Sequence, residues 1–436
     1  MNNERKEIVA GRGFYYMPSA FLTVKMTVES VYDHKRMEKA VLSLEEAHPI
    51  INNVARKEGD RMWFENVGKH VPIVVYAEET GIKWEDAVLE LTTPPVNLLE
   101  TPGVTVGVVV RPDCFYLLMV CHHMYGDGIS VKNLADDLLY MYITGKKVEV
   151  KEAYTELSES DLPLDCKAPE ELRDRYVAFN NTCWNKKIEF TWEMYKRMID
   201  THNQAVISGI SCKNIKGEAY HNLRSKCKEL GVTVNSALTT AMAAAMQKGD
   251  SIDAIVSVDT RPLFGYQKED GIANFASCVQ PNIHYDSTIG FWENVAVVDK
   301  QVKEERLNKQ KMLNTLYTFM LWGADAFGVG YYARYGMFRD MEVLMELRKT
   351  LGLNSEAETF EISNIGNVEM AVNSEDFVVR DCYFAPNLMP ACACTFGVVS
   401  LGDTLTISLG YKKKFVPDET AQQIMEDVVS YLKDCA

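Results

Sequence analysis

Basic side chains are the scarce charge in this sequence. Its 436 residues include 46 lysines and arginines against 61 aspartates and glutamates, which gives a net charge of −15. A surface of that sign repels the phosphate backbone of nucleic acids, so nucleic-acid binding is excluded as the default function. Hydrophobic residues make up 47% of the chain, enough for a sizeable packed core. A folded protein that acts on a small molecule is therefore expected.

Hydrophobic runs that would direct or anchor the chain are also missing. The N-terminal segment MNNERKEIVAG has no apolar core of the kind a signal peptide needs. One long apolar stretch, residues 312–333, carries Asp325 near its middle, where a charge is costly in a bilayer. We therefore expect no membrane span, and a buried helix and loop in that stretch.

The cysteines show no disulfide pattern. There are eleven, an odd number, scattered along the chain without the spacing of a small disulfide scaffold. Free thiols in a reducing cytoplasm are the expected state. Cys392 and Cys394 lie at strand spacing, but no second pair of metal ligands accompanies them. We expect both to be structural and predict no metal site.

Several motifs of well-known catalytic sites are absent. The sequence has no G-x-S-x-G nucleophile, no Walker A loop and no H-E-x-x-H zinc motif. Gly328, Gly330 and Ala333 fit G-x-G-x-x-A by letter, but their aromatic neighbours do not fit the strand, turn and helix of a dinucleotide site. These absences favour a reaction that uses a lone base.

The length of the chain predicts two domains or two similar halves. We place the halves at residues 1–170 and 171–436, with a charged, proline-containing linker over 145–180. Alternating and helical periodicities predict mixed α/β structure in both halves. The strands expected from these patterns are 23–28, 62–67, 73–77, 104–110, 115–121, 404–411 and one that runs into a loop within 253–262. The expected helices are 33–47, 84–91, 130–140, two within 221–246 joined at Gly231, and 420–432.

The segment CHHMYGDG matches the pattern HHxxxDG at His122, His123, Asp127 and Gly128. Adjacent residues of an extended segment point to opposite faces, so the two histidines do not chelate one metal together. One should face the core and the other a cavity. Imidazole suits general-base work because its pKa lies near working pH. The alternative is a pair of structural histidines at a strand end.

Other segments strengthen this interpretation. The chain resembles the condensation domains of nonribosomal peptide synthesis, alcohol acetyltransferases, plant acyltransferases and chloramphenicol acetyltransferase. The resemblance runs from about residue 20 to the C-terminus. Its further segments are GVTVNSALTTAMAAAM at 231–246, VSVDTRP at 256–262, GIANFASC at 271–278 and SNIG at 363–366.

The resemblance implies an α/β fold, an α+β sandwich of two chloramphenicol-acetyltransferase-like halves in a V-shaped pseudo-dimer. The active site would lie at their junction, in a channel that reaches His123 from two sides. His123 would be the base, and Asp127 would pair with Arg261 to hold the site. Gly128 and His122 would give structural support.

The same resemblance implies how the acyl group moves. Asn274, Ser363 and Asn364 would line the tunnel or stabilise the oxyanion, although turn formation is the simpler role for such residues. The acyl group would pass directly from a pantetheine thioester to a hydroxyl or amine of a small acceptor, without an acyl-enzyme. No cofactor would be bound permanently, because acyl-CoA or acyl-phosphopantetheine is a co-substrate.

Placement within the superfamily stays open at this point. The D-F-G-W-G motif of plant acyltransferases is absent, and the histidine segment of condensation domains survives only as Ala47-His48-Pro49. A stand-alone acyltransferase resembling alcohol acetyltransferases is the leading hypothesis. The alternatives are a free-standing condensation enzyme that takes substrates from acyl or peptidyl carrier proteins, and a catalytically silent binding protein. Residues 412–414, three lysines, would hold coenzyme A phosphates or form a solvated strand end.

Overall fold

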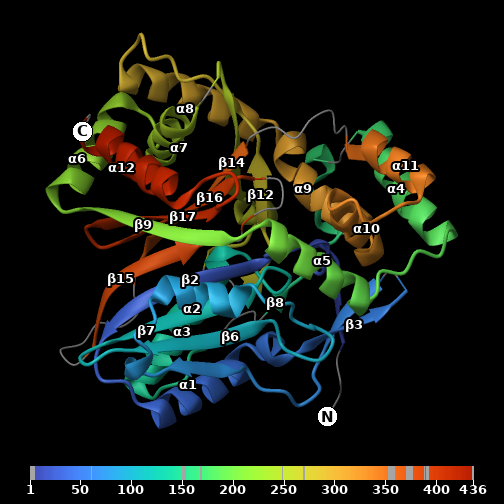
Figure 1. Ribbon diagram of the computed structural model, residues 1–436, viewed down its shortest axis with the longest axis horizontal. Helices are drawn as coiled ribbons and strands as arrows, with labels where there is room; N and C mark the ends of the chain where they lie inside the picture. The colour runs from blue at the N-terminus through green and yellow to red at the C-terminus, as the bar shows by residue number, and fades with distance from the viewer. Residues whose placement is uncertain are drawn as a thin grey trace.

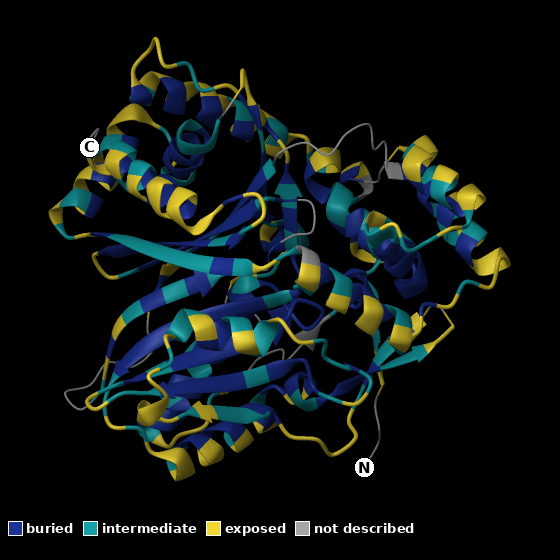
Figure 2. Cartoon of the chain, in the orientation of Figure 1, coloured by how far each residue is buried: buried dark blue, intermediate teal, exposed yellow. Residues whose placement is uncertain are grey.

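Two large β-sheets form the framework of the protein (Figure 1). The computed structural model describes residues 5–59, 61–149, 154–166, 169–247, 249–268, 271–351, 359–369, 377–386, 388 and 392–434. Within these residues, one sheet has five strands and the other has seven. Buried residues concentrate on the sheets, and exposed residues on the outer helices (Figure 2).

The five-stranded sheet belongs mainly to the N-terminal half. Its strand order is β15 (Val378–Ala385), β2 (Phe21–Glu29), β7 (Phe115–His122), β6 (Val104–Val110) and β5 (Ile73–Tyr76). Helices α1 (His34–Ala47) and α3 (Gly128–Thr144) pack together beside it, and α3 contacts β2 and β7. The shorter helix α2 (Trp84–Thr92) also contacts β6 and β7.

The seven-stranded sheet belongs to the C-terminal half. Its order is β12 (Ala276–Val279), β10 (Ile252–Asp259), β14 (Thr359–Val368), β16 (Cys394–Leu401), β17 (Thr404–Lys412) and β9 (Ser208–Lys216), with β13 (Asn282–Ile283) also on β10. Its helices are α6 (Glu218–Leu230), α7 (Val234–Met246), α8 (Phe291–Leu307) and α12 (Asp418–Asp434). Alternate residues of the strands pack with these helices into a separate core.

A third group of helices packs beside both sheets (Figure 1). It consists of α4 (Glu170–Asn185), α5 (Trp192–Ala205), α9 (Lys309–Leu321), α10 (Ala324–Arg334) and α11 (Met341–Leu351). Buried residues of these helices join the hydrophobic cluster of the N-terminal sheet. Smaller elements are β1 (Lys6–Ile8), β3 (Val54–Glu58), β4 (Arg61–Glu65), β8 (Tyr154–Thr155), β11 (Ile272–Ala273), η1 (Gly11–Phe14), η2 (Pro49–Asn52), η3 (Glu78–Thr80), η4 (Glu159–Asp161), η5 (Leu164–Cys166) and η6 (Arg261–Phe264).

The expected mixed α/β architecture is confirmed, and two local expectations need correction. The linker expected over residues 145–180 is wrong at its C-terminal end, because α4 begins at Glu170. The apolar stretch at 312–333 forms two helices rather than a helix and a loop. The Asp325 carboxylate there accepts a hydrogen bond from the Phe190 backbone and pairs with Lys57 at 2.9 Å, which explains how a charge is tolerated among apolar residues.

In the described part of the chain, no helix combines the length and the apolar composition needed to cross a membrane. The division at residue 170 stays a prediction. Strand β15, from the C-terminal half, pairs antiparallel with β2, and β8 pairs in parallel with β11 across the division. The two halves are therefore joined by shared sheets as well as by packing.

A buried charge fixes the crossing strand β15 to β2. The Lys25 ammonium lies 2.6 Å from the Asp381 carboxylate and donates to the Thr27 hydroxyl at 2.5 Å. The rings of Trp84, Tyr116 and Tyr383 surround the ammonium at 5.6, 4.6 and 4.9 Å from their centroids. The Lys25 side chain is only 4% exposed, so its carboxylate partner is needed to offset the cost of burying the charge.

We predict that Asp381→Ala lowers the free energy of unfolding by about 3 kcal/mol, because it leaves the buried Lys25 ammonium without its counter-charge. The matched control is Arg380→Ala, which removes an exposed ion pair with Glu29 on the same two strands and should cost less than about 1 kcal/mol. Urea unfolding followed by circular dichroism measures both values. Equal losses for the two variants would contradict the prediction.

Candidate functional site

The HHxxxDG segment begins where β7 ends. His122 is the last residue of the strand and lies opposite Phe21 of β2. The backbone N–H groups of His122 and His123 donate to the carbonyl groups of Gly103 and Ala20, each at 2.7 Å. These bonds continue the sheet through both histidines before the chain turns.

Two glycines allow the turn that follows to pack closely. A Cβ on Gly126 would lie 2.7 Å from the Ser130 side chain, and one on Gly128 would lie 2.8 Å from both Ile365 and the Phe384 ring. Gly128 is the first residue of α3, and Asp127 caps that helix by accepting a hydrogen bond from the Ser130 backbone at 3.0 Å. The turn therefore begins a helix whose first residue touches the C-terminal half.

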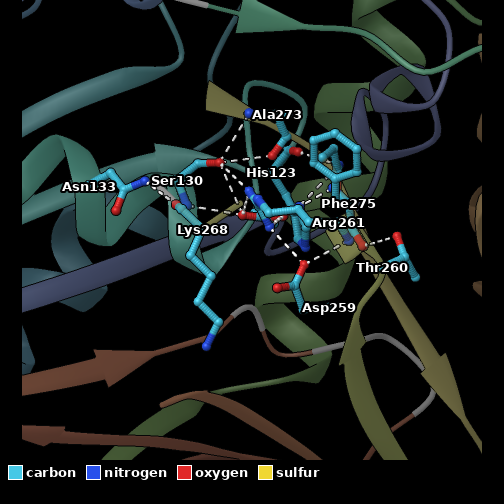
Figure 3. A network of polar contacts seen from close by, with 11 residues as sticks. His123, Ser130, Asn133, Asp259, Thr260, Arg261, Lys268, Ala273 and Phe275 are labelled. Carbon is cyan, nitrogen blue, oxygen red and sulfur yellow. Dashed lines mark hydrogen bonds and ion pairs between the residues drawn. The ribbon is translucent and has the colours of Figure 1, made fainter. Parts of the chain in front are cut away.

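Asp127 and Arg261 form a two-pronged ion pair across the junction of the halves. Figure 3 shows Arg261 among the polar contacts of this junction, near Ser130 and Phe275. The Arg261 Nη1 and Nη2 atoms donate to Oδ2 and Oδ1 of Asp127 at 2.7 and 2.9 Å. The Phe275 backbone donates to the same carboxylate at 3.0 Å. Burial by itself raises the pKa of Asp127, but Arg261 and the hydrogen bonds outweigh it and hold that pKa below its ordinary value.

His123 lies beside this pair and is 7% exposed. The side-chain amide nitrogen of Asn274 donates to the His123 carbonyl at 3.0 Å and lies 3.4 Å from the ring Nδ1 atom. The Phe14 ring stacks on the imidazole, with the centroids 3.8 Å apart and the planes 7° apart. Burial lowers the pKa of His123 to about 4, although Asp127 and the backbone carbonyl groups of His123 and Gly126 act in the opposite direction. The ring is therefore neutral at pH 7.

His122 has a different environment on the other face of the strand. It is fully buried, its Nδ1 accepts a hydrogen bond from the Met124 backbone at 3.2 Å, and its ring meets the edge of Phe21 at 5.0 Å. Burial, and then the neighbouring His123, lowers the pKa of His122 to about 3. Packing and turn formation are the roles that these contacts support.

The structure brings Asn274 to His123 but places Asn364 elsewhere. The Asn364 amide group hydrogen-bonds with Asn235 at the start of α7, at 3.2 Å, and with the Gly366 backbone, at 2.9 Å. Ser363 pairs with Gly397 within the seven-stranded sheet. The segment 363–366, expected to be a turn, lies within β14 (Thr359–Val368), and Asn364 stands where the pairing of β14 with β16 shifts in register.

The three lysines at 412–414 do not form one exposed group. Lys412 is buried, Lys413 pairs with Asp418 at 2.9 Å, and Lys414 is exposed. Within the described residues, no cluster of three or more His, Cys, Asp or Glu side chains is arranged to hold a metal ion.

The sequence patterns did not predict two residues that contribute to the site, Ser130 and Phe14. The Ser130 hydroxyl donates to the Ala273 carbonyl at 2.8 Å and lies 3.0 Å from Asp127. Its position three residues after a capping aspartate was a usable local signal. Phe14 lies more than one hundred positions before His123, and no local pattern connects the two.

A small cavity of about 60 Å³ lies between the halves. Its lining includes Ser19, Phe21 and Thr23 of the N-terminal half and Ser208 and Gly410 of the C-terminal half. The Thr23 hydroxyl is buried and has no hydrogen-bond partner among the described residues. His123 is not among the lining residues, so the expected channel to His123 from two sides stays a prediction.

No family model matches the chain. A bacitracin synthase 1 from Bacillus licheniformis is 20% identical over 439 residues, which cover 97% of this chain and 8% of that protein. The chain thus spans a small fraction of that relative.

Several solved structures, in contrast, match this chain over nearly their whole length. The epimerization domain from the third module of tyrocidine synthetase B has a TM-score of 0.62 at 15% identity, over 99% of this chain and 97% of that one. A starter condensation domain of rhizomide synthetase has a TM-score of 0.61 at 12% identity, over 98% and 94%. Polyketide synthase associated protein 5 from Mycobacterium tuberculosis has a TM-score of 0.59 at 10% identity, over 98% of this chain and 97% of that one.

These likenesses cover nearly the whole chain. The protein therefore has the two-lobed fold of condensation domains, and the resemblance expected from the sequence is confirmed for the fold.

We predict that Asp127→Ala and Arg261→Ala each lower the free energy of unfolding by about 3–5 kcal/mol, because each leaves a buried charge unpaired. The double variant should lose less than the sum of the two. Asp259→Ala is the control, since Asp259 touches Arg261 at 3.1 Å but is 22% exposed and leaves the pair intact. Thermal and urea unfolding of the four variants test this. Additive losses would contradict a direct pairing.

Proposed function

We propose that the protein transfers an acyl group from a pantetheine thioester to a hydroxyl or amine of a small acceptor, with His123 as general base. The observation that carries the proposal is the neutral, buried imidazole of an intact HHxxxDG turn at the junction of two lobes. Asp127, Arg261 and Asn274 hold that turn from both halves. Imidazole in this state accepts a proton without first losing one.

A single base is sufficient for both proton transfers of the proposed reaction. His123 takes the proton from the acceptor as the acceptor oxygen or nitrogen attacks the thioester carbonyl carbon. The tetrahedral adduct then collapses, the C–S bond breaks, and the imidazolium gives its proton to the leaving thiolate. The neighbouring Cys121 is a poor nucleophile, because it is fully buried and burial raises the pKa of its thiol. Direct transfer without an acyl-enzyme is therefore the mechanism we propose.

Two versions of this function differ in the thioester that donates the acyl group. Coenzyme A thioesters would serve a stand-alone acyltransferase, whereas carrier-bound thioesters would serve a free-standing condensation enzyme. The starter condensation domain among the similar structures was solved with C8-CoA and Leu-SNAC, which supports a thioester donor in this fold. Incubation with acyl-CoA mixtures and, separately, with loaded carrier proteins, followed by mass spectrometry, distinguishes the two. Absence of transfer from either donor would favour a silent binding protein.

We predict that His123→Ala lowers the rate of acyl transfer by about a hundred- to ten-thousand-fold while the melting temperature changes little, because the base is lost and the turn is held by other groups. His122→Ala should do the reverse, lowering stability more than turnover. Steady-state kinetics and thermal melts on both variants measure this. Near-native turnover of the His123 variant would reject the assignment.

We predict an unusually acidic lower limit for activity. The base works only when neutral, and a pKa lowered from 6.5 to about 4 keeps His123 neutral well below pH 6. The ratio kcat/KM should therefore be nearly constant from about pH 7 to about pH 5 and fall with a midpoint near the pKa of His123. Melting curves at each pH control for unfolding. A midpoint near 6.5 would contradict the prediction.

A further inference from the structure

The N-terminal segment lies directly over the HHxxxDG turn. Phe14, the last residue of η1, stacks on His123, and the edge of the Phe319 ring meets Phe14 at a centroid distance of 4.8 Å. A Cβ on Gly11 would lie 2.5 Å from the Met124 carbonyl oxygen. The backbone of η1 therefore touches the turn, and only a residue without a side chain fits at that point.

Polar contacts hold this segment to the helices of the C-terminal half. The Arg12 guanidinium donates to the Met320 carbonyl at 2.6 Å, and the Tyr331 hydroxyl donates to the Gly13 carbonyl at 3.2 Å. A Cβ on Gly13 would lie 2.6 Å from the Phe319 ring, so this ring packs closely against the backbone. Phe14 is thus fixed over His123 from helices α9 and α10.

On the far side, the Glu156 carboxylate accepts hydrogen bonds from the backbones of Val9 and Ala10 at 3.0 and 2.7 Å. The segment is therefore anchored both just before η1 and within it. Phe14 itself is only 5% exposed. One face of the imidazole is covered by an apolar ring that has no proton to exchange.

We propose that Phe14 is a positioning residue that covers His123 against water, so that the base takes its proton from the acceptor and not from solvent. The inference rests on the proposed function. The Phe14 ring over the imidazole prevents hydrolysis of the bound thioester. In that side reaction a water oxygen attacks the carbonyl carbon, His123 takes the proton of the water, the C–S bond breaks and the thiolate receives the proton. The products are a carboxylic acid and a free thiol.

The first test does not depend on activity. Diethyl pyrocarbonate modifies accessible neutral imidazoles, and peptide mass spectrometry gives the rate at each histidine. His70, with a side chain that is 70% exposed, is the internal reference. We expect slow modification of His123 in the wild type, several-fold faster modification in Phe14→Ala and Phe14→Leu, and wild-type behaviour in Phe14→Tyr, which keeps the ring. Equal rates at His123 in all four proteins would overturn the proposal.

The leucine variant keeps most of the apolar volume, so it guards against unfolding of the alanine variant. Thermal melts establish which variants are folded. If Phe14→Leu is folded and its His123 is modified as slowly as in the wild type, an aromatic ring is not needed, and the proposal is also overturned.

The second test measures hydrolysis without any acceptor. The probe is a mixture of acetyl-CoA, butyryl-CoA and octanoyl-CoA, and the release of free coenzyme A is followed by mass spectrometry. We expect faster release with Phe14→Leu than with the wild type or Phe14→Tyr, and a return to background in the double variant Phe14→Leu with His123→Ala. Faster modification of His123 without faster release, in a protein that does transfer these acyl groups, would overturn the role in suppressing hydrolysis. If the wild type transfers nothing from any thioester, the proposed function fails, while the modification rates still decide whether Phe14 covers His123.

Discussion

The ion pair between Asp127 and Arg261 is the interaction on which the rest of the site depends. It joins the N-cap of α3 in one half to the first residue of η6, just after β10, in the other, with both side chains nearly inaccessible to solvent. Two charges so deeply buried are stable only while they face each other, because either alone would lack solvation. The relative position of the two halves at this point is therefore strictly fixed. His123, four residues before Asp127, acquires its position from that constraint.

The two histidines show how one strand gives adjacent, chemically identical side chains different environments. Both have a lowered pKa because both are buried. His123 differs in that Asp127 and nearby carbonyl groups favour its protonated form, which partly offsets burial. The charged imidazolium is therefore disfavoured at both histidines, but less strongly at His123 than at His122. The alternation of a β-strand, together with one buried carboxylate, is sufficient to distinguish the two.

Much of this could be predicted from the sequence, because its signals are local. The strand before His122, the turn at Gly126 and Gly128 and the partnership of Asp127 with Arg261 rest on short patterns and on the resemblance that these patterns support. The contribution of Phe14 could not be predicted, since its contact with His123 depends on how η1 is held by α9 and α10. For the same reason, the position of β15 beside β2 was not apparent. Nothing in residues 378–385 indicates which sheet they join.

The exchange of strands between the halves explains why a site built at their junction can be geometrically well defined. A cleft between two independent domains would change shape whenever the domains moved. Here β15 is hydrogen-bonded along β2, and the Lys25 ammonium is enclosed by an aspartate and two rings that lie on different strands. Relative motion of the halves at this edge would require breaking a sheet and exposing a buried charge at once. The Asp127–Arg261 pair fixes the centre of the same junction, so His123 keeps its position even though the residues around it come from segments more than a hundred positions apart.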